Sequence, residues 1–140
     1  MITRAHIRRQ LRKNGGIMNV TPRQGYFLGK IVKGAKKADL TSTSATTLYT
    51  VPSFSTAVIK SIIVSEDSGN ADTITVTLTD TSDNVFSLFK TKSISANATT
   101  ELLSAPLVAQ ESEVIKVTAA TANRLHVVLS ALEIKPREVT

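Results

Sequence analysis

Hydrophobic and polar residues alternate one by one along much of the chain after residue 45. The clearest stretch is 72–80, where Ile74, Val76 and Leu78 are separated by single threonines. A period of two places the apolar side chains on one face of a strand and the threonines on the other. β-Branched threonine also favours the extended backbone. The stretch therefore predicts an antiparallel strand with one buried face and one solvated face.

Six further segments have the length and composition of strands, and short polar turns separate them. They are 47–51, 56–65, 85–90, 99–103, 114–119 and 124–133. Short strands joined by polar turns are typical of sandwiches and barrels. We therefore predict an all-β fold: an antiparallel β-sandwich, jelly-roll-like, with an extended basic N-terminal arm containing short helices. The predicted domains are the arm (1–43), the sandwich (44–135) and a short C-terminal tail (136–140).

The apolar positions of these strands define a predicted core. Its members are Leu48, Val51, Val58, Ile62, Val64, Ile74, Val76, Leu78, Phe86, Leu88, Leu102, Leu107, Val114, Ile115, Val117, Val127, Leu129 and Leu132. Two segments, 62–64 and 127–129, are apolar on both faces. This pattern favours a second buried surface supplied by a neighbouring subunit, and the alternative is ordinary irregularity of a small core.

The first 43 residues follow a different pattern, with apolar residues at helical spacing. Helices are predicted over 3–13, which ends at Asn14-Gly15-Gly16, and over 26–38. Neither is long enough to be stable alone in water, and Gly29 and Gly34 weaken the second. We therefore expect the arm to become ordered on a partner. The alternative is a solvated basic tail.

Charge divides the chain at the same place. Residues 1–40 carry ten Lys or Arg against one acid (+9), and residues 41–140 carry seven against ten (−3), which together give the net +6. The residues predicted to anchor the arm are Arg4, Arg8, Arg9, Arg12, Arg23, Phe27, Lys30, Ile31, Lys33, Lys36 and Lys37. A basic amphipathic segment binds a membrane surface, nucleic acid or an acidic protein surface. The thin apolar stripe disfavours a membrane, so a protein partner is preferred, with nonspecific DNA contact as its rival.

Residues suited to catalysis or metal binding are sparse. The chain has no cysteine, and its two histidines, His6 and His126, do not supply a zinc site. Glu66, Asp67 and Asp72 are candidate calcium ligands, but their spacing matches no dedicated loop, so acids of a surface turn are the preferred interpretation. No nucleophile elbow or phosphate-binding loop is present. We therefore predict no enzyme activity, cofactor, metal site or small-molecule substrate.

Several segments together resemble β-sandwich structural proteins of tailed-bacteriophage virions. They are LYTVPS (48–53), TAVIKSIIV (56–64), DTITVTL (72–78), the step from 95–97 into 101–108, VIKVTA (114–119), LHVVLSALEI (125–134) and the arm segments 1–17 and 25–29. The chain departs from the commoner turn after Pro52, where Phe54 becomes an exposed aromatic and a candidate subunit contact.

The resemblance implies a structural role in the virion. The leading expectation is a capsid cement or decoration protein, an oligomer whose arm is anchored on the major capsid protein or connector. The alternatives are a neck, connector or tail protein, or a receptor- or glycan-binding module tethered by its arm. The expected location is the virion, after synthesis in the host bacterial cytoplasm, which agrees with the lack of cysteine.

Overall fold

The regular structure of residues 29–136, the part of the chain that the computed structural model describes, consists of β-strands without any helix. In chain order the strands are β1 (Gly29–Asp39), β2 (Thr46–Thr50), β3 (Thr56–Glu66), β4 (Asp72–Thr79), β5 (Val85–Ile94), β6 (Thr99–Glu101), β7 (Leu107–Ala109), β8 (Val114–Ala119) and β9 (Leu125–Pro136). The predicted all-β class is confirmed, and the seven predicted strands correspond to β2, β3, β4, β5, β6, β8 and β9.

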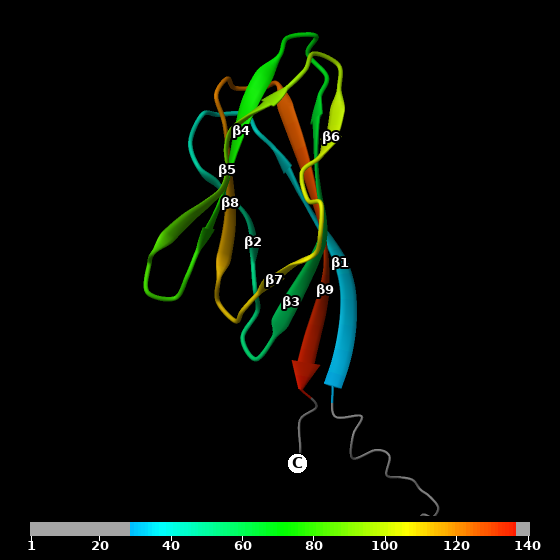
Figure 1. Ribbon diagram of the computed structural model, residues 1–140, viewed down its shortest axis with the longest axis vertical. Coiled ribbons are helices and arrows are strands. Elements are labelled where there is room, and N and C mark those ends of the chain that lie inside the picture. The colour runs from blue at the N-terminus through cyan, green and yellow to red at the C-terminus, as the bar shows by residue number, and fades with distance from the viewer. Residues whose placement is uncertain (1–28, 137–140) are drawn as a thin grey trace, which may run out of the picture. The chain divides into compact units, whose positions relative to one another are not determined.

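The strands form two antiparallel sheets packed as a sandwich (Figure 1). The five-stranded sheet has the order β1-β9-β3, and the far edge of β3 pairs with both β6 and β7. The four-stranded sheet has the order β2-β8-β4-β5. When β6 and β7 are counted as one interrupted strand, the orders become 1-8-3-6 and 2-7-4-5. This is the connectivity of an eight-stranded jelly roll, as predicted.

The core lies between the two sheets, and β4 shows how the sequence builds it. Along this strand every second residue is buried, and the threonines between them are half-exposed, in agreement with the alternating pattern. β4 pairs with β5 on one side and with β8 on the other. The largest fully buried apolar side chains are Leu40, Ile59, Ile62, Ile74, Ile94, Ile115, Leu125 and Leu129.

A β-bulge in β3 changes which residues face the core. The register with β9 shifts between Ile59 and Ser61, so Ala57 and Ile59 are buried before the bulge and Ile62 and Val64 after it. The prediction that Val58 and its partner Leu132 belong to the core is therefore wrong. Four more predicted core residues are not fully buried. Phe86, on the edge strand β5, is exposed, and Leu88, Leu107 and Val114 are partly exposed, although Leu88 and Leu107 pack against the core.

A second register shift places both Leu48 and Tyr49 of β2 in the core. The Tyr49 hydroxyl donates a hydrogen bond of 2.6 Å to Oε2 of Glu133 on β9, and so links the two sheets. Burial, together with the hydrogen bond and the negative charge of Glu133, raises the pKa of Tyr49 above its usual range. Strict alternation along β2 predicts only one of these two buried side chains.

The predicted helix over 26–38 is wrong for its described part, because residues 29–39 form the edge strand β1 beside β9. Leu40 directly after it is buried: its N–H donates to the carbonyl of Leu125 (3.0 Å) and its carbonyl accepts from the N–H of Asn123 (2.8 Å). Gly34 and Val32 are poor helix formers. Since β9 offers a free edge, pairing across the sheet satisfies the backbone better than an isolated helix.

The sheet thus takes in part of the segment that was predicted to be an arm. The other predicted helix, 3–13, lies outside the described residues, as do residues 137–140 of the predicted tail. No helix in residues 29–136 could cross a membrane.

Candidate interaction surface

The candidate calcium ligands Glu66, Asp67 and Asp72 contact other groups of the protein. Asp72 is 7% exposed, and its Oδ2 accepts the N–H of Thr121 at 3.1 Å. Glu66 is 2% exposed, so the interpretation of these acids as ordinary surface residues is wrong for two of the three. Among residues 29–136, no three His, Cys, Asp or Glu side chains are placed to hold a metal ion.

Glu66 joins the turn after β3 to the turn before β6. Its carboxylate accepts the backbone N–H groups of Ser68 (2.7 Å), Gly69 (3.2 Å) and Asn97 (2.8 Å), and also the Ser68 hydroxyl. Gly69 has a φ of 80°, which a residue with a side chain rarely adopts. Desolvation alone raises the pKa of Glu66, but these hydrogen bonds outweigh it and lower the pKa to about 2.

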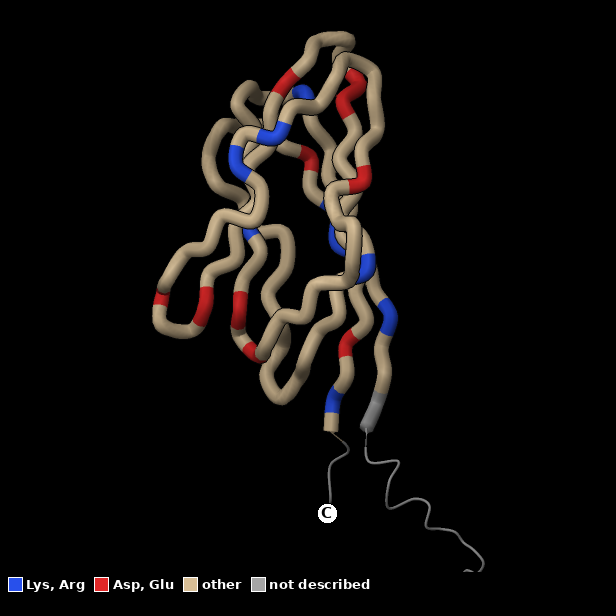
Figure 2. The backbone as a smooth tube through the Cα atoms, in the orientation of Figure 1, with Lys and Arg blue, Asp and Glu red and all other residues tan. Residues whose placement is uncertain are grey.

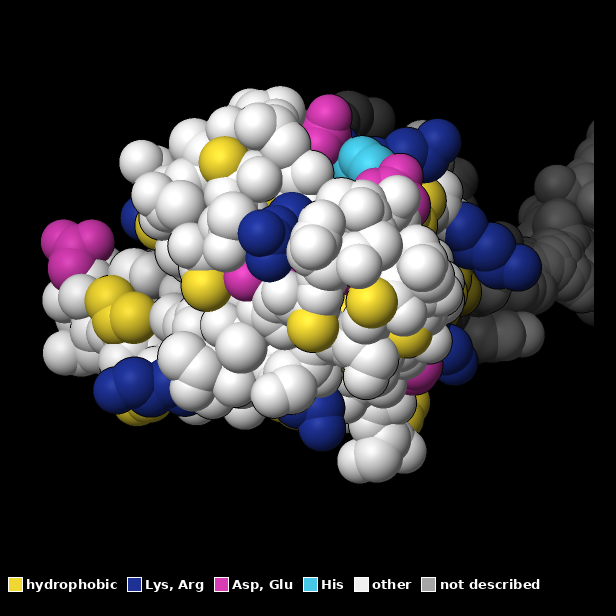
Figure 3. Space-filling view, turned by 90° about the horizontal axis from the view of Figure 1, so that it is seen from above, with side chains coloured by type: hydrophobic (Ala, Val, Ile, Leu, Met, Phe, Trp, Pro, Cys, Tyr) yellow, Lys and Arg dark blue, Asp and Glu magenta, His cyan; other side chains and the backbone are white. Residues whose placement is uncertain are grey.

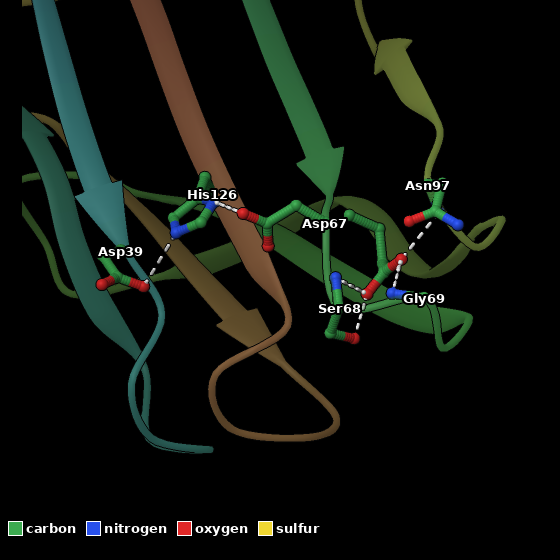
Figure 4. A network of polar contacts seen from close by, with 7 residues as sticks. Asp39, Asp67, Ser68, Gly69, Asn97 and His126 are labelled. Carbon is green, nitrogen blue, oxygen red and sulfur yellow. Dashed lines mark hydrogen bonds and ion pairs between the residues drawn. The ribbon is translucent and has the colours of Figure 1, made fainter.

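His126 lies between two acids (Figures 3 and 4). Its Nε2 is 3.3 Å from Oδ1 of Asp39, and its Nδ1 is 3.5 Å from Oδ2 of Asp67. The three residues come from the end of β1, the start of β9 and the turn after β3. The cluster connects the edge strand to the rest of the sheet. Its members are about half exposed, and contacts between exposed side chains of this kind contribute little to stability.

Six apolar side chains lie on the outer face of the five-stranded sheet, on the side away from the core. Val58 lies opposite Leu132 of β9 and Val108 of β7, and Ile63 lies opposite Val128. Residues opposite one another in antiparallel strands share a face. We define the apolar patch as Val58, Ile63, Val108, Val128, Leu132 and Ile134. Three of them are well exposed: Val108 at 53%, Ile134 at 40% and Ile63 at 37%.

The apolar patch gives a structural basis for the predicted second surface. In the segments 62–64 and 127–129, the first and third residues face the core. The middle residues, Ile63 and Val128, belong to the apolar patch. Contiguous exposed apolar surface marks a binding site in soluble proteins. That a neighbouring subunit covers it stays a prediction.

Charged side chains of both signs surround the apolar patch in two groups. The basic group is Lys33 and Lys60, which together with Gly34, Ser130, Ala131 and Leu132 line a shallow depression. The acidic group is Asp39, Asp67 and Glu101; Glu101 accepts hydrogen bonds from the Ser61 hydroxyl and from the N–H of Ile62 at 2.8 Å. Figure 2 shows acidic positions toward the upper end of this sheet, lysines below them, and a further acidic position near the lower end of β9.

The predicted anchoring residues fall into two sets. Lys30, Ile31, Lys33, Lys36 and Lys37 lie on β1, and Ile31 is 60% exposed. Arg4, Arg8, Arg9, Arg12, Arg23 and Phe27 lie outside the described residues. A lysine-rich edge strand has a further physical consequence: it discourages uncontrolled pairing of the free edge with other chains. The anchoring part of both sets stays a prediction.

Phe54 stands at the tip of the turn between β2 and β3, as the sequence predicts. It is 76% exposed and has a φ of 58°. A bulky residue in this left-handed region is strained, and such strain is retained mainly where it serves a purpose. Whether Phe54 contacts another subunit stays a prediction.

No protein family and no curated protein matches this chain. Among solved structures, the sandwich is similar to a chain from the disulfide-linked pili of Bacillus endospore appendages, with a TM-score of 0.47 and 12% identity over 79% of this chain and 91% of that chain. It is also similar to a chain of the cyanophage Pam1 capsid (TM-score 0.40, 17% identity, 79% and 88%) and to one of infectious bursal disease virus (0.42, 9%, 76% and 32%). With TM-scores below 0.5, these similarities carry no functional conclusion.

Proposed function

We propose that the protein is a non-enzymatic structural component of a virus particle, in which the jelly roll packs against neighbouring subunits. The observation that carries the proposal is the apolar patch, which stays exposed although the sandwich already encloses a complete core. A face of this kind is suited to assembly. Jelly rolls recur in capsid proteins, and also in lectins and cupins, so the fold supports the proposal by analogy.

Within this class, the sequence resemblance favours a tailed bacteriophage and a capsid cement or decoration role. A neck, connector or tail position is the alternative. Residues 1–28 contain six Lys or Arg and no acid. We propose that they anchor the protein on the major capsid protein or connector through charge complementarity, with nonspecific DNA contact as the rival.

Any test of anchoring must leave β1 and Leu40 in place, since removing residues 1–40 takes away an edge strand and a core side chain. The full-length variant with Arg4, Arg8, Arg9 and Arg12 changed to Gln meets this condition. Particles assembled in its presence are compared by mass spectrometry with particles assembled with the wild-type chain. We expect the variant to keep the β-sheet circular dichroism of the wild type and to be lost from particles.

The matched control removes lysines from the four-stranded sheet instead: Lys90, Lys92 and Lys116 to Gln. This variant is expected to enter particles normally. Normal uptake of the four-glutamine variant refutes the anchoring role, and a wild-type chain absent from purified particles refutes the virion assignment.

A receptor- or glycan-binding module is the second candidate function. The observation in its favour is the exposure of two aromatic rings, Phe54 at 76% and Phe86 at 52%, because sugars stack on aromatic faces. Binding of the intact chain to a glycan array, lost in the Phe54→Ala variant, supports this candidate, and an array without signal removes it.

A further inference from the structure

We propose that the apolar patch pairs with the apolar patch of a second copy of this chain, about a two-fold axis that lies in the interface near Ser61 and Ser130. The inference rests on the proposed function and adds a partner, a face and a symmetry to it. A two-fold interface is isologous, so the same face must be complementary to itself. The layout of apolar, small and charged side chains on the outer face meets this condition.

The apolar side chains are arranged evenly about a small central pair. Ser61 of β3 lies opposite Ser130 of β9. Val128 lies two residues before Ser130 on β9 and is opposite Ile63. Leu132 lies two residues after Ser130 and is opposite Val58. A two-fold axis at the serine pair therefore lays apolar pairs on apolar pairs, whether it runs along the strands or across them.

The charged groups favour the axis that runs across the strands. That axis reverses the strand direction between the copies. It brings Lys33 of each copy toward Asp39 of the other, because Lys33 lies near Leu132 on one side of the serine pair and Asp39 lies near His126 on the other side. A face with charges of one sign only would repel its own copy, whereas opposite charges around an apolar centre give orientation and specificity. Val108, at 53% exposed, extends the apolar centre on the β7 side.

The first experiment measures the mass of the intact chain by sedimentation across protein concentrations. The wild type is expected to form a complex of two chains and nothing larger. Val108→Asp places a charge within the patch and is expected to weaken the dimer by about 100-fold or more. Val85→Asp is the matched control, because Val85 is 61% exposed on the edge strand of the other sheet. It is expected to leave the dimer unchanged.

A cross-linking experiment tests the position of the axis, since a residue close to a two-fold axis meets its own copy. The chain contains no cysteine, so Ser130→Cys introduces a single thiol. Mild oxidation is expected to yield disulfide-linked dimers, and Val108→Asp in the same chain is expected to prevent them. Ser87→Cys is the control, because Ser87 is exposed and lies opposite Thr77 on the outer face of the four-stranded sheet.

Charge reversal tests the direction of the axis. Lys33→Glu and Asp39→Lys are each expected to weaken the dimer, and the double variant is expected to restore it at least in part. Failure of the double variant to restore the dimer overturns the axis across the strands.

The inference is overturned if the wild type keeps the mass of one chain at every protein concentration up to about 100 μM. Assembly beyond two chains, or cross-linking of Ser87→Cys as fast as Ser130→Cys, also overturns it. These results are distinct from failure of the proposed function. A monomer that still enters particles leaves the virion role intact, with another subunit on the patch, while a dimer that enters no particle keeps the pairing and refutes the virion role.

Discussion

Replacing Leu40 with alanine tests whether the chain directly after β1 belongs to the core of the sandwich. Leu40 is 1% exposed, and its backbone is held by hydrogen bonds to Leu125 and Asn123. Truncating a buried leucine to alanine costs about 2–5 kcal/mol, the sum of lost burial and the cavity left behind. If residue 40 lay in a separate arm, as the charge pattern predicts, the same change would cost almost nothing.

The assay is equilibrium unfolding in urea, followed by circular dichroism at one fixed protein concentration, because dimerisation makes stability depend on concentration. With a loss of about 3 kcal/mol and a slope of about 2 kcal/mol per molar urea, the unfolding midpoint falls by about 1.5 M. The slope itself is expected to stay unchanged, since the same surface becomes exposed on unfolding.

Val85→Ala is the matched control, because it truncates an apolar side chain that is 61% exposed. Its effect is expected to stay within about 0.5 kcal/mol. Equal midpoints for the Leu40→Ala and Val85→Ala variants would refute the assignment of Leu40 to the core, and with it the edge position of β1.

Three further outcomes are expected. Tyr49→Phe leaves the half-buried Glu133 carboxylate without its hydroxyl donor, and is expected to cost about 1–3 kcal/mol in the same urea assay. The pKa of Glu66 is about 2 in the folded protein against an ordinary value of 4.5. Its contribution to stability is therefore complete above about pH 4.5 and is lost as the pH falls toward 2. Melting temperatures of the wild type and Glu66→Gln are expected to converge over that pH range, and a constant gap between them contradicts the assignment. Phe54→Gly relieves a left-handed backbone at an exposed position and is expected to raise stability by about 1 kcal/mol, whereas a loss would mean that the ring packs in the folded chain.

Local pattern sufficed for strands whose two faces differ in polarity. β4 and β8 begin and end within a residue of the predicted segments. Ile74, Val76, Leu78, Ile115 and Val117 are buried as predicted, whereas Val114 is partly exposed. β7, by contrast, has three residues and was missed, because a strand this short shows no period. Its Val108 therefore could not be assigned to any face before β3 supplied the pairing.

The candidate interaction surface was predicted only in part. Apolar residues on both faces of 62–64 and 127–129 pointed correctly to Ile63 and Val128 as members of a second apolar surface. Val58 and Leu132 were assigned to the core instead, because a bulge at residues 59–61 leaves no clear mark in the sequence. The side-chain contacts of His126 are with residues 39 and 67, and the sequence around His126 does not predict partners so far away in the chain.

The division of the chain into basic residues 1–40 and mildly acidic residues 41–140 is a property of composition, so it could be read directly from the sequence. The same is true of the fold class, since strand periodicity is set by neighbours two residues apart. The residue at which the sandwich begins along the chain was decided by tertiary structure. Residues 29–39 have an ambiguous local preference, and the free edge of β9, almost a hundred residues later, settles it by pairing with their backbone. For the same reason, the apolar patch exists only once β3, β7 and β9 lie side by side, because long-range pairing determines which side chains share a face.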